Sequence, residues 1–387
     1  MEKNIPTLRF PEFVGEWVVK RLGDVASRIV SKNKEKNTNV LTISAQYGLI
    51  SQLEFFNKSV SAKDVSGYYL LSRNDFAYNK SYSNGYPMGA IKRLSRYDKG
   101  VVSTLYICFK NTTEFDNSFA EQYFETGKQN EEIEKVAQEG ARNHGLLNIG
   151  VSDFFNIEVT IPEITEQTKI ASFLTAVDNK LSQLKRKKEL LEHYKKGVMQ
   201  KLFSQELRFK DENGEDYPEW EEKPLGECLG YIQPTNYLVS STEYDDSFNI
   251  PVLTAGKTFI LGYTNETTGI FKDNLPVIIF DDFTTATQFV DFPFKAKSSA
   301  MKILIANKNV NIKFMYEAMQ ILDYEIGGHE RHWISKFSQL NLLIPTLKEQ
   351  TKIANFLSAI DEKIQYNNQQ IAKMESWKKG LLQQMFV

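Results

Sequence analysis

Two short motifs in the chain carry residue types that other proteins use to hold phosphate or zinc. Gly256-Lys257-Thr258 resembles the end of a phosphate-binding loop, but Pro251 stands where that loop needs its first glycine. His329 and His332 are three residues apart, whereas a zinc-binding His-Glu-x-x-His motif spaces its histidines by four on a helix. Neither motif therefore predicts a nucleotide or metal site.

The sequence also lacks the usual signs of catalysis. Asp281 and Asp282 are adjacent, so on a strand they face opposite ways, and we interpret them as turn or cap residues. A DNA amino-methyltransferase would show Asn or Asp before Pro-Pro and an aromatic residue, and no Pro-Pro pair occurs. No glycine-rich cofactor loop follows a predicted strand. We expect a chain that is not an enzyme, with no metal site and no cofactor of its own.

Basic residues interleaved with aromatic and amide side chains indicate a different chemistry. One such set runs from Lys80 to Tyr86 and another from Thr285 to Lys295, and basic loops follow at 140–145 and 327–333. Lys and Arg neutralise phosphates, while amides and Arg read base edges in the major groove. The predicted DNA-binding residues are Lys80, Tyr82, Asn84, Tyr86, Lys92, Arg93, Arg142, His144, Lys257, Gln288, Lys295, Lys297, His329, Arg331 and His332. For any single one of them, a solvated loop with a buried tyrosine is the alternative.

Composition sets the class of protein. A chain of 387 residues is long enough for two domains that each bury a core. Cys108 and Cys228 form no metal or disulfide pattern, which fits a reducing cytoplasm. No apolar run reaches the roughly 20 residues of a membrane span. We expect a soluble, cytoplasmic protein.

The formal net charge is −2, but the charge is segregated along the chain. Residues 77–110 carry a local charge of +5 and residues 291–314 a local charge of +4. Residues 206–227, between the two halves, carry −6. Bulk charge does not favour nucleic acid, whereas these local basic segments do.

A repeated segment organises the whole chain. Residues 161–203 and 344–386 align without a gap at an offset of 183 and are identical at 19 of 43 positions. A second repeated frame, Trp-x4-Leu-Gly, begins at Trp17 and again at Trp220. Duplication of this extent fixes the architecture before any local interpretation.

The repeated segment has the pattern of a long, paired helix. Apolar residues recur every seven positions from Ile170 and again from Ile353, which is a coiled-coil seam. Asn367 interrupts the second seam, and we interpret it as a polar residue that sets the register. Thr346 and Glu349 have the spacing of a capping box. About 38 helical residues would make a rod of roughly 57 Å.

Chain order predicts how the two rods pair. If a domain precedes each helix, the second helix must run antiparallel to the first for the two seams to bury each other. The alternative explanation of the heptad pattern is core packing within an ordinary helical domain. The predicted fold is α+β, with two α/β domains separated by two long antiparallel coiled-coil helices in a pseudo-two-fold internal repeat. The predicted boundaries are 1–160 for domain 1, 161–205 for helix 1, 206–343 for an acidic linker with domain 2, and 344–387 for helix 2.

Within the domains the repeat is weak, and the elements are predicted singly. Residues 101–109 read as one continuous apolar strand, and residues 277–280 and 301–305 read as strands. Residues 118–127, 130–139 and 312–322 read as helices. The central segments of the two domains differ in sequence, whereas their first and last segments match. This is the divergence expected if each domain reads a different target.

The duplicated layout resembles a known family. Trp-x4-Leu-Gly, a variable domain, Ile-Pro-x4-Gln-x-Lys-Ile-Ala-x-Phe-Leu-x-x-(Val/Ile)-Asp and a long helix, all of it twice, is similar to the DNA specificity subunit of type I restriction-modification systems. The resemblance covers nearly the whole chain. It implies a bacterial DNA-binding protein whose two target-recognition domains each read half of a bipartite site.

The same resemblance implies partners and roles. It implies duplex DNA, two modification (methyltransferase) subunits that bind S-adenosylmethionine, and ATP-driven restriction subunits, with no cofactor on this chain. It also implies that the helices space the half-sites and dock the modification subunits. The residues that carry the shared helix motif, for docking or helix pairing, are Gln167, Lys169, Phe173, Asp178, Lys180, Gln350, Lys352, Phe356, Asp361 and Lys363, together with Asn367 in the seam.

Two hypotheses from other functional classes stay open. One is a structural adaptor with two protein-binding heads on a coiled-coil spacer, and the other is a nuclease or methyltransferase with degenerate motifs.

The length of the helices fits the spacing of DNA half-sites. Half-sites one DNA turn apart need recognition units about 34–36 Å apart, and a stiff helical spacer is of that order. Changing the length of a rod should therefore change the preferred gap between half-sites.

Overall fold

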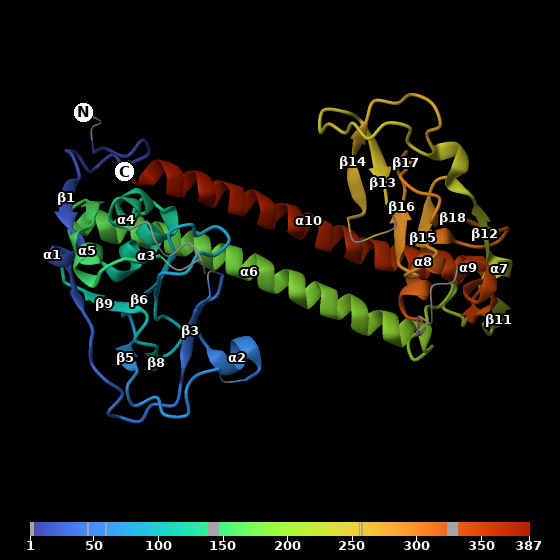
Figure 1. Ribbon diagram of the computed structural model, residues 1–387. Coiled ribbons are helices and arrows are strands. Elements are labelled where there is room, and N and C mark those ends of the chain that lie inside the picture. Colours follow the sequence, from blue (N-terminus) through green and yellow to red (C-terminus); the bar gives the residue numbers. More distant parts are fainter. Residues whose placement is uncertain are drawn as a thin grey trace. The chain divides into compact units, whose positions relative to one another are not determined.

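The computed structural model describes residues 4–44, 46–58, 60–137, 147–254, 256, 258–322 and 332–387. The chain divides into two units, one formed by Met1–Lys185 with Gln369–Val387 and the other by Arg186–Asn368. Two long helices, α6 (Ile164–Phe203) and α10 (Leu347–Met385), each contribute to both units (Figure 1). None of the helices in the described residues is long and apolar enough to cross a membrane.

The head of the first unit is built on a four-stranded antiparallel sheet in the order β2-β9-β6-β7. The helix α3 packs its aromatic side chains against this sheet, with Phe124 in edge contact with Phe76 and Phe109. The elements of this head are β1 (Val18–Arg21), α1 (Leu22–Val25), β2 (Ala26–Arg28), β3 (Leu41–Ser44), β4 (Gly48–Ser51), α2 (Gln52–Phe56), β5 (Tyr69–Ser72), β6 (Phe76–Asn79), β7 (Ala90–Arg93), β8 (Lys99–Val102), β9 (Ile107–Asn111), α3 (Asn117–Thr126), α4 (Asn130–Val136), α5 (Val151–Asn156) and β10 (Glu158–Ile161).

The prediction of a single strand over residues 101–109 was wrong. The chain turns between β8 and β9, so the apolar run supplies two strands, one paired with β5 and the other with β6 and β2. An apolar run shows burial but not where a buried chain bends. The predicted helix at 118–127 is confirmed as α3, while the helix predicted at 130–139 ends as α4 at Val136.

The head of the second unit repeats this plan. Its main sheet has the order β12-β18-β15-β16, which corresponds position by position to the main sheet of the first head. The strands predicted at 277–280 and 301–305 and the helix predicted at 312–322 are confirmed as β15, β18 and α8. The elements are β11 (Glu221–Pro224), α7 (Leu225–Cys228), β12 (Leu229–Ile232), η1 (Pro234–Tyr237), β13 (Ile250–Leu253), β14 (Ile260–Thr264), β15 (Val277–Asp281), β16 (Thr287–Val290), β17 (Lys295–Ala296), β18 (Met301–Ala306), α8 (Ile312–Gln320), α9 (His332–Ser335), η2 (Phe337–Gln339) and β19 (Asn341–Ile344).

The repeated Trp-x4-Leu-Gly frame forms the junction between each head and its long helix. In each unit the strand that follows the tryptophan pairs antiparallel with the strand that leads into the helix, β1 with β10 and β11 with β19. A Cβ on Gly23 would lie 3.1 Å from the carbonyl oxygen of Phe155, and one on Gly226 would lie 3.1 Å from that of Ser338. This close approach of two backbones explains why both copies have glycine.

A buried carboxylate in the first turn of each helix completes the junction. Glu166 accepts hydrogen bonds from Arg9 Nε and Nη2, both at 2.7 Å, and from the indole of Trp17 at 3.4 Å. Glu349 accepts the equivalent hydrogen bonds from Arg208, at 3.2 and 3.0 Å, and from Trp220 at 3.1 Å. We name these two sets the carboxylate clamps. The capping-box spacing of Glu349 thus marks a carboxylate that binds the head.

The next residue of each helix, a glutamine, also binds its own head. The Gln167 side chain accepts from Asp116 N and donates to the carbonyls of Glu114 and Pro162. Gln350 makes the same three hydrogen bonds, accepting from Asn311 N and donating to the carbonyls of Asn309 and Pro345. The glutamines of the shared motif therefore act inside the chain, as part of the head-to-helix junction.

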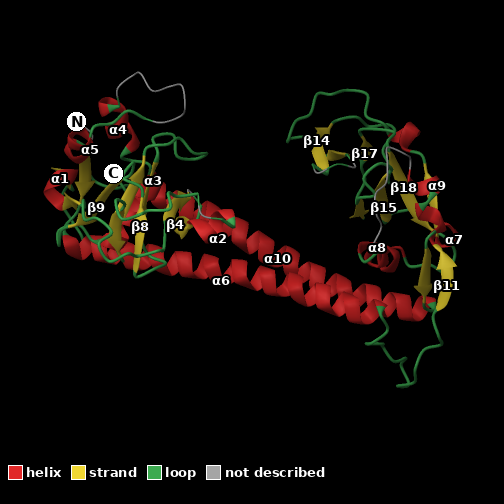
Figure 2. Ribbon diagram, turned by 60° about the horizontal axis from the view of Figure 1, so that its bottom comes forward, coloured by secondary structure: helices red, strands yellow, loops and turns green. Residues whose placement is uncertain are grey.

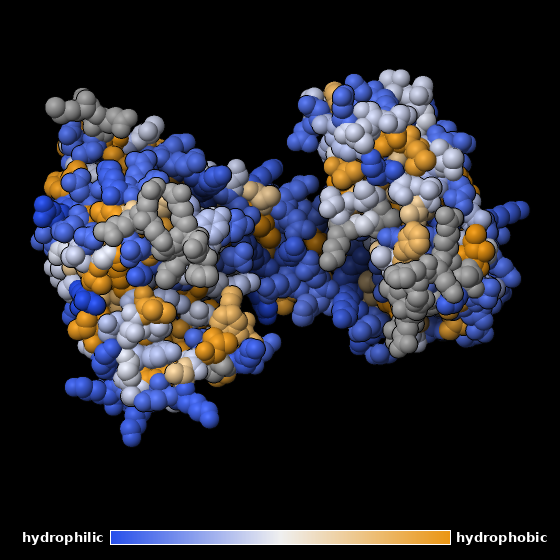
Figure 3. Space-filling model, viewed as in Figure 1, coloured by the Kyte–Doolittle hydropathy of each residue, from blue (hydrophilic) through white to orange (hydrophobic). Residues whose placement is uncertain are grey.

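The two long helices pair antiparallel, as the sequence predicted. In the first unit, Asp178 of α6 binds Lys378 of α10 at 2.5 Å, and in the second unit Lys195 of α6 binds Asp361 of α10 at 2.7 Å. The start of each helix thus meets the end of the other. Asn367 is buried in the seam. The visible outer face of the helix pair is largely hydrophilic (Figure 3), and the same pairing is seen from another side in Figure 2.

A charge cluster lies in each unit where the start of one long helix contacts the end of the other. We call these two places the helix crossings. The members of the cluster differ between the two units. In the first unit, Asp178 binds Lys378 and accepts a hydrogen bond from Gln122 of α3. In the second unit, Asp361 binds Lys195 and Lys313, and both lysines also bind Glu317 of α8, which takes the place of Gln122. The glutamate adds a negative charge and Lys313 adds a positive one, so both clusters are neutral.

Titration of Asp361 follows from this cluster. Burial raises the pKa of its carboxyl, but hydrogen bonds from Lys195 and Lys313 outweigh burial and hold that pKa below the ordinary value of 3.8. A carboxyl with a lowered pKa contributes stability above its ordinary pKa. That contribution is lost as the pH falls through the lower, folded-state value.

We predict that the charges of the second cluster are interdependent. Lys313→Ser or Glu317→Gln alone should lower the free energy of unfolding by about 3 kcal/mol, because each leaves a buried charge uncompensated. The double variant reproduces the neutral cluster of the first unit and should recover most of that loss. Urea unfolding followed by tryptophan fluorescence measures this, since Trp220 and Trp333 lie in the core of the same unit.

The reciprocal pair, Ser118→Lys and Gln122→Glu, is the matched control in the first unit. It should be tolerated as a double variant and costly when either change is made alone. Additive effects of the two single changes in both units would contradict the interdependence.

Candidate nucleic-acid interface

The two main sheets present equivalent hairpins, β6–β7 in one head and β15–β16 in the other. The last residue of the first strand is Asn79 in one hairpin and Asp281 in the other. Asn79 Oδ1 accepts the N–H of Ser81 at 3.1 Å, and Asp281 Oδ1 accepts the N–H of Phe283 at 2.9 Å. Each hairpin tip therefore begins with the same side-chain-stabilised turn.

The residue after this turn position anchors a second segment in both heads. The carbonyl of Lys80 accepts from Leu147 N at 2.9 Å, and the carbonyl of Asp282 accepts from His332 N at 2.9 Å. Leu147 and His332 are the first described residues after the stretches 138–146 and 323–331. In both heads, the first described residue after a predicted basic stretch is therefore hydrogen-bonded to the start of a hairpin tip. The predicted residues Arg142, His144, His329 and Arg331 lie outside the described residues, as does Lys257.

The tips carry exposed aromatic side chains on turns with a left-handed residue, which is strained at Thr285 but not at Gly85. Tyr82 is 64% exposed in the first head, and Phe283 is 43% exposed in the second. Gly85 in the first tip has φ +82°, and Thr285 in the second has φ +59°. A left-handed backbone is unfavourable for a β-branched residue, and such strain is concentrated at functional sites. Lys80 and Tyr86 are half-buried, and Asn84 is exposed, at the first tip.

Three predicted residues of the first head are held in internal contacts. Lys92 is buried, binds Glu125 and donates to the hydroxyl of Tyr86 at 2.9 Å. Tyr86 donates in turn to Glu125, and burial together with this carboxylate raises the pKa of its hydroxyl. Arg93 binds Glu121 at 2.7 Å. The prediction that Lys92 contacts DNA directly is not supported, because Glu125 neutralises its charge inside the head.

Two predicted DNA-binding residues of the second head are also buried. Lys295 is buried between Glu266 at 2.5 Å and the carbonyl of Thr268 at 2.7 Å, and the His332 side chain is buried. A direct DNA contact is therefore not supported for Lys295 or His332. Gln288 is exposed on β16, and Lys297 is half-buried over the ring of Tyr244. Both remain candidates for contact.

One tip residue was missed from the sequence. Phe283 stands between two Asp and two Thr residues and belongs to no basic cluster, so no pattern singled it out. Below it, the fully buried Lys302 binds Asp282 Oδ2 at 3.4 Å and lies over the ring of Tyr231. Asp281 forms a turn, as interpreted from the sequence, whereas Asp282 is a buried residue of the core, which the sequence did not predict.

The remaining motif residues of the helices are divided between internal contacts and the surface. Lys169 binds Glu12, and Lys352 donates to the carbonyl of Lys210 at 2.7 Å. The rings of Phe173 and Phe356 pack on Phe10 and Phe209, respectively. Lys180 and Lys363 are exposed on the equivalent helix faces.

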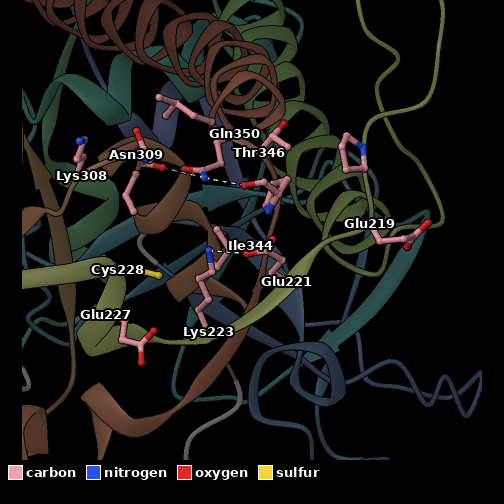
Figure 4. A pocket seen from close by; sticks show the side chains of 14 residues that line it. Glu219, Glu221, Lys223, Glu227, Cys228, Lys308, Asn309, Ile344, Thr346 and Gln350 are labelled. Atoms are coloured by element: carbon pink, nitrogen blue, oxygen red, sulfur yellow. Dashed lines mark hydrogen bonds and ion pairs between the residues drawn. The ribbon is translucent and has the colours of Figure 1, made fainter.

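A polar pocket of about 480 Å³ lies at the second junction, beside the start of α10 (Figure 4). Its lining side chains bind one another, Lys223 with Glu221 at 2.7 Å and Gln350 with the carbonyls of Asn309 and Pro345. We therefore assign no ligand to it. The described residues contain no group of three or more His, Cys, Asp or Glu side chains that could hold a metal ion.

These features define a class of protein, a duplicated chain whose two heads are clamped to an antiparallel helix pair and present equivalent hairpin tips. The model of the Type I restriction modification DNA specificity domain matches residues 15–193 and 217–376. The chain belongs to this family and is a type I restriction-modification specificity subunit.

Individual relatives agree in sequence or fold. The EcoR124I/EcoR124II specificity subunit of Escherichia coli is 56% identical over 128 residues, a match that spans only 32% of this chain and 31% of that one. The MjaVIII specificity subunit of Methanocaldococcus jannaschii is 23% identical over 98% of this chain and 93% of its own. The crystal structure of an S subunit from M. genitalium has the same fold, with a TM-score of 0.65, 17% identity and 99% of both chains covered.

We predict that Lys80 and Lys92 affect DNA binding differently. Lys80→Ala should reduce the slope of log affinity against log salt concentration by about one, as expected for one lost phosphate contact. Lys92→Ala should leave that slope unchanged and lower the melting temperature, because it leaves Glu125 unpaired. Equal slopes for the two variants would refute the distinction between surface and internal lysines.

Proposed function

We propose that this chain reads a bipartite DNA site, with one half-site contacted by each hairpin tip. The proposed target-recognition domains are residues 1–160 and 206–343. The observation that carries the proposal is that the same turn is built twice, by Asn79 and by Asp281, and that the next carbonyl in each head accepts a hydrogen bond from the first described residue after a basic stretch of sequence.

The tips also differ in the way that two readers of unlike sequences should. Ten residues, 80–89, join β6 to β7, and five residues, 282–286, join β15 to β16. The first loop offers Ser, Asn and Lys side chains and the second Thr side chains, so their hydrogen-bonding groups differ. Base edges in the major groove are distinguished by such donor and acceptor patterns. We infer that the two half-sites differ in sequence.

The helices are proposed to space the heads and to dock two modification subunits. Gln167, Gln350 and the carboxylate clamps bind this chain's own heads, so we assign docking to exposed motif positions such as Lys180 and Lys363. The chain itself is non-catalytic in this proposal. Methylation with S-adenosylmethionine belongs to the modification subunits, and ATP-dependent cleavage belongs to restriction subunits.

Methylation mapping tests the proposal directly. The chain is co-expressed with a modification subunit, and methylated adenines are located across a genome. A single bipartite motif with a fixed gap supports the proposal, and methylation by the chain alone would show an enzyme. An adaptor would direct no methylation and would bind site-containing and random duplexes with no salt slope.

We predict that the gap follows the length of the helices. One heptad inserted into each helix, after Lys185 and after Asn368, keeps the seam in phase and lengthens the pair by about 10 Å. At 3.4 Å per base pair the preferred gap should grow by about three base pairs. The same insertion in the exposed turn after Glu212 is the control and should leave the gap unchanged. An unchanged gap after the helix insertion would exclude the spacer role.

A further inference from the structure

We propose that Tyr82 and Phe283 make the apolar base contacts of the two heads. Each ring packs against the C5-methyl group of a thymine in the major groove. This inference rests on the proposed function, because it assigns a base contact to tips that are there proposed to meet DNA. It names one residue for each head and one chemical group on the DNA.

Exposure of these two rings is the first observation. Tyr82 and Phe283 are large aromatic side chains left 64% and 43% exposed, each among small polar residues of its own tip. Leaving that much apolar surface in water forgoes the free energy of burial. An apolar ring in a polar setting is suited to the one apolar group that a base edge offers in the major groove, the thymine methyl.

The backbone that carries each ring is also fixed by hydrogen bonds before any ligand arrives. In the second head, Asp281 accepts the N–H groups of Phe283 and Thr284, and the carbonyl of Asp281 accepts from Thr285 N at 2.9 Å. In the first head, Ser83 and Tyr86 bind each other through both backbone N–H groups across the turn at Gly85. Rigid presentation reduces the entropy lost on binding, which favours recognition of a fixed shape.

Hairpin geometry selects the groove. Two paired strands with their side chains fit the major groove, about 12 Å wide, whereas the minor groove of about 6 Å is too narrow for them. Both rings occupy the tip of a hairpin at the same place in the sheet order, β6–β7 and β15–β16. The tip is therefore the part of each head that reaches deepest into a groove.

Charge around the tips favours DNA over a protein partner through one lysine in each head. Lys80 lies half-buried in the first tip, and Lys297 is half-buried in the second head. The other basic residues near them, Lys92, Arg93, Lys295 and Lys302, are paired with carboxylates of their own heads and add little net charge. A protein-docking patch would expose apolar area without an excess of one charge, whereas phosphates flank every base edge.

The test combines protein and DNA changes in one cycle. The full chain, purified with its modification subunits, is assayed on a duplex containing the mapped site and on duplexes in which single thymines are replaced by deoxyuridine. For the unaltered protein we expect about a fourfold loss of affinity at one thymine of each half-site, the value of one buried methyl group. Tyr82→Ala should abolish that loss in one half-site only, and Phe283→Ala in the other only.

Matched variants separate the ring from the hydroxyl and from general surface effects. Tyr82→Phe should keep the sensitivity to deoxyuridine, because the ring is retained. Phe56→Ala, which removes another exposed aromatic ring of the same head, should leave it unchanged. Loss of affinity by the tip variants without any thymine-methyl dependence would overturn the inference, and so would equal effects on both half-sites. If the complex of the unaltered chain bound its mapped site no more tightly than random duplex, the proposed function itself would be contradicted.

Discussion

The buried carboxylate at the start of each long helix is the interaction on which the rest of the structure depends. Glu166 and Glu349 are almost completely buried, and each binds one arginine and one tryptophan of its own head. A buried carboxylate left without these donors would cost several kcal/mol, so the head and the helix have one favourable relative placement. The positive end of the helix dipole stabilises the same charge. Rigid attachment of each head follows from this one charge.

The duplication shows which contacts tolerate change. The clamps and the two glutamines are the same in both copies. Each carboxylate accepts from a bidentate arginine and an indole, and each glutamine binds three backbone groups, so a change of either residue leaves several partners unsatisfied. The charge cluster at each helix crossing has changed, from Gln122 to Glu317, together with the addition of Lys313. Charge neutrality was kept while side chains were exchanged. The hairpin tips differ between the copies in both length and residue type.

Prediction from the sequence was good for periodic features and poor for pairing. The long helices and their antiparallel pairing followed from heptads and chain order, and α3, α8, β15 and β18 followed from local pattern. The turn between β8 and β9 did not, because burial of both strands hides it. The lysines at 92, 295 and 302 are buried against carboxylates 20 or more residues away, so a count of basic residues could not separate them from surface lysines. The stretches 138–146 and 323–331 lie outside the described residues.

The buried ion pairs under the tips give those lysines a structural role that needs no contact with DNA. Lys302 with Asp282, and Lys92 with Glu125 and Tyr86, fix the base of each hairpin from within the head. Removal of a lysine leaves its carboxylate without a cationic partner, fully buried for Asp282 and partly buried for Glu125, which disfavours any other position of the hairpin. The left-handed Thr285 persists only because its neighbours are fixed in this way. The tips are therefore set by the chain itself, and a partner that fits them does not have to order them first.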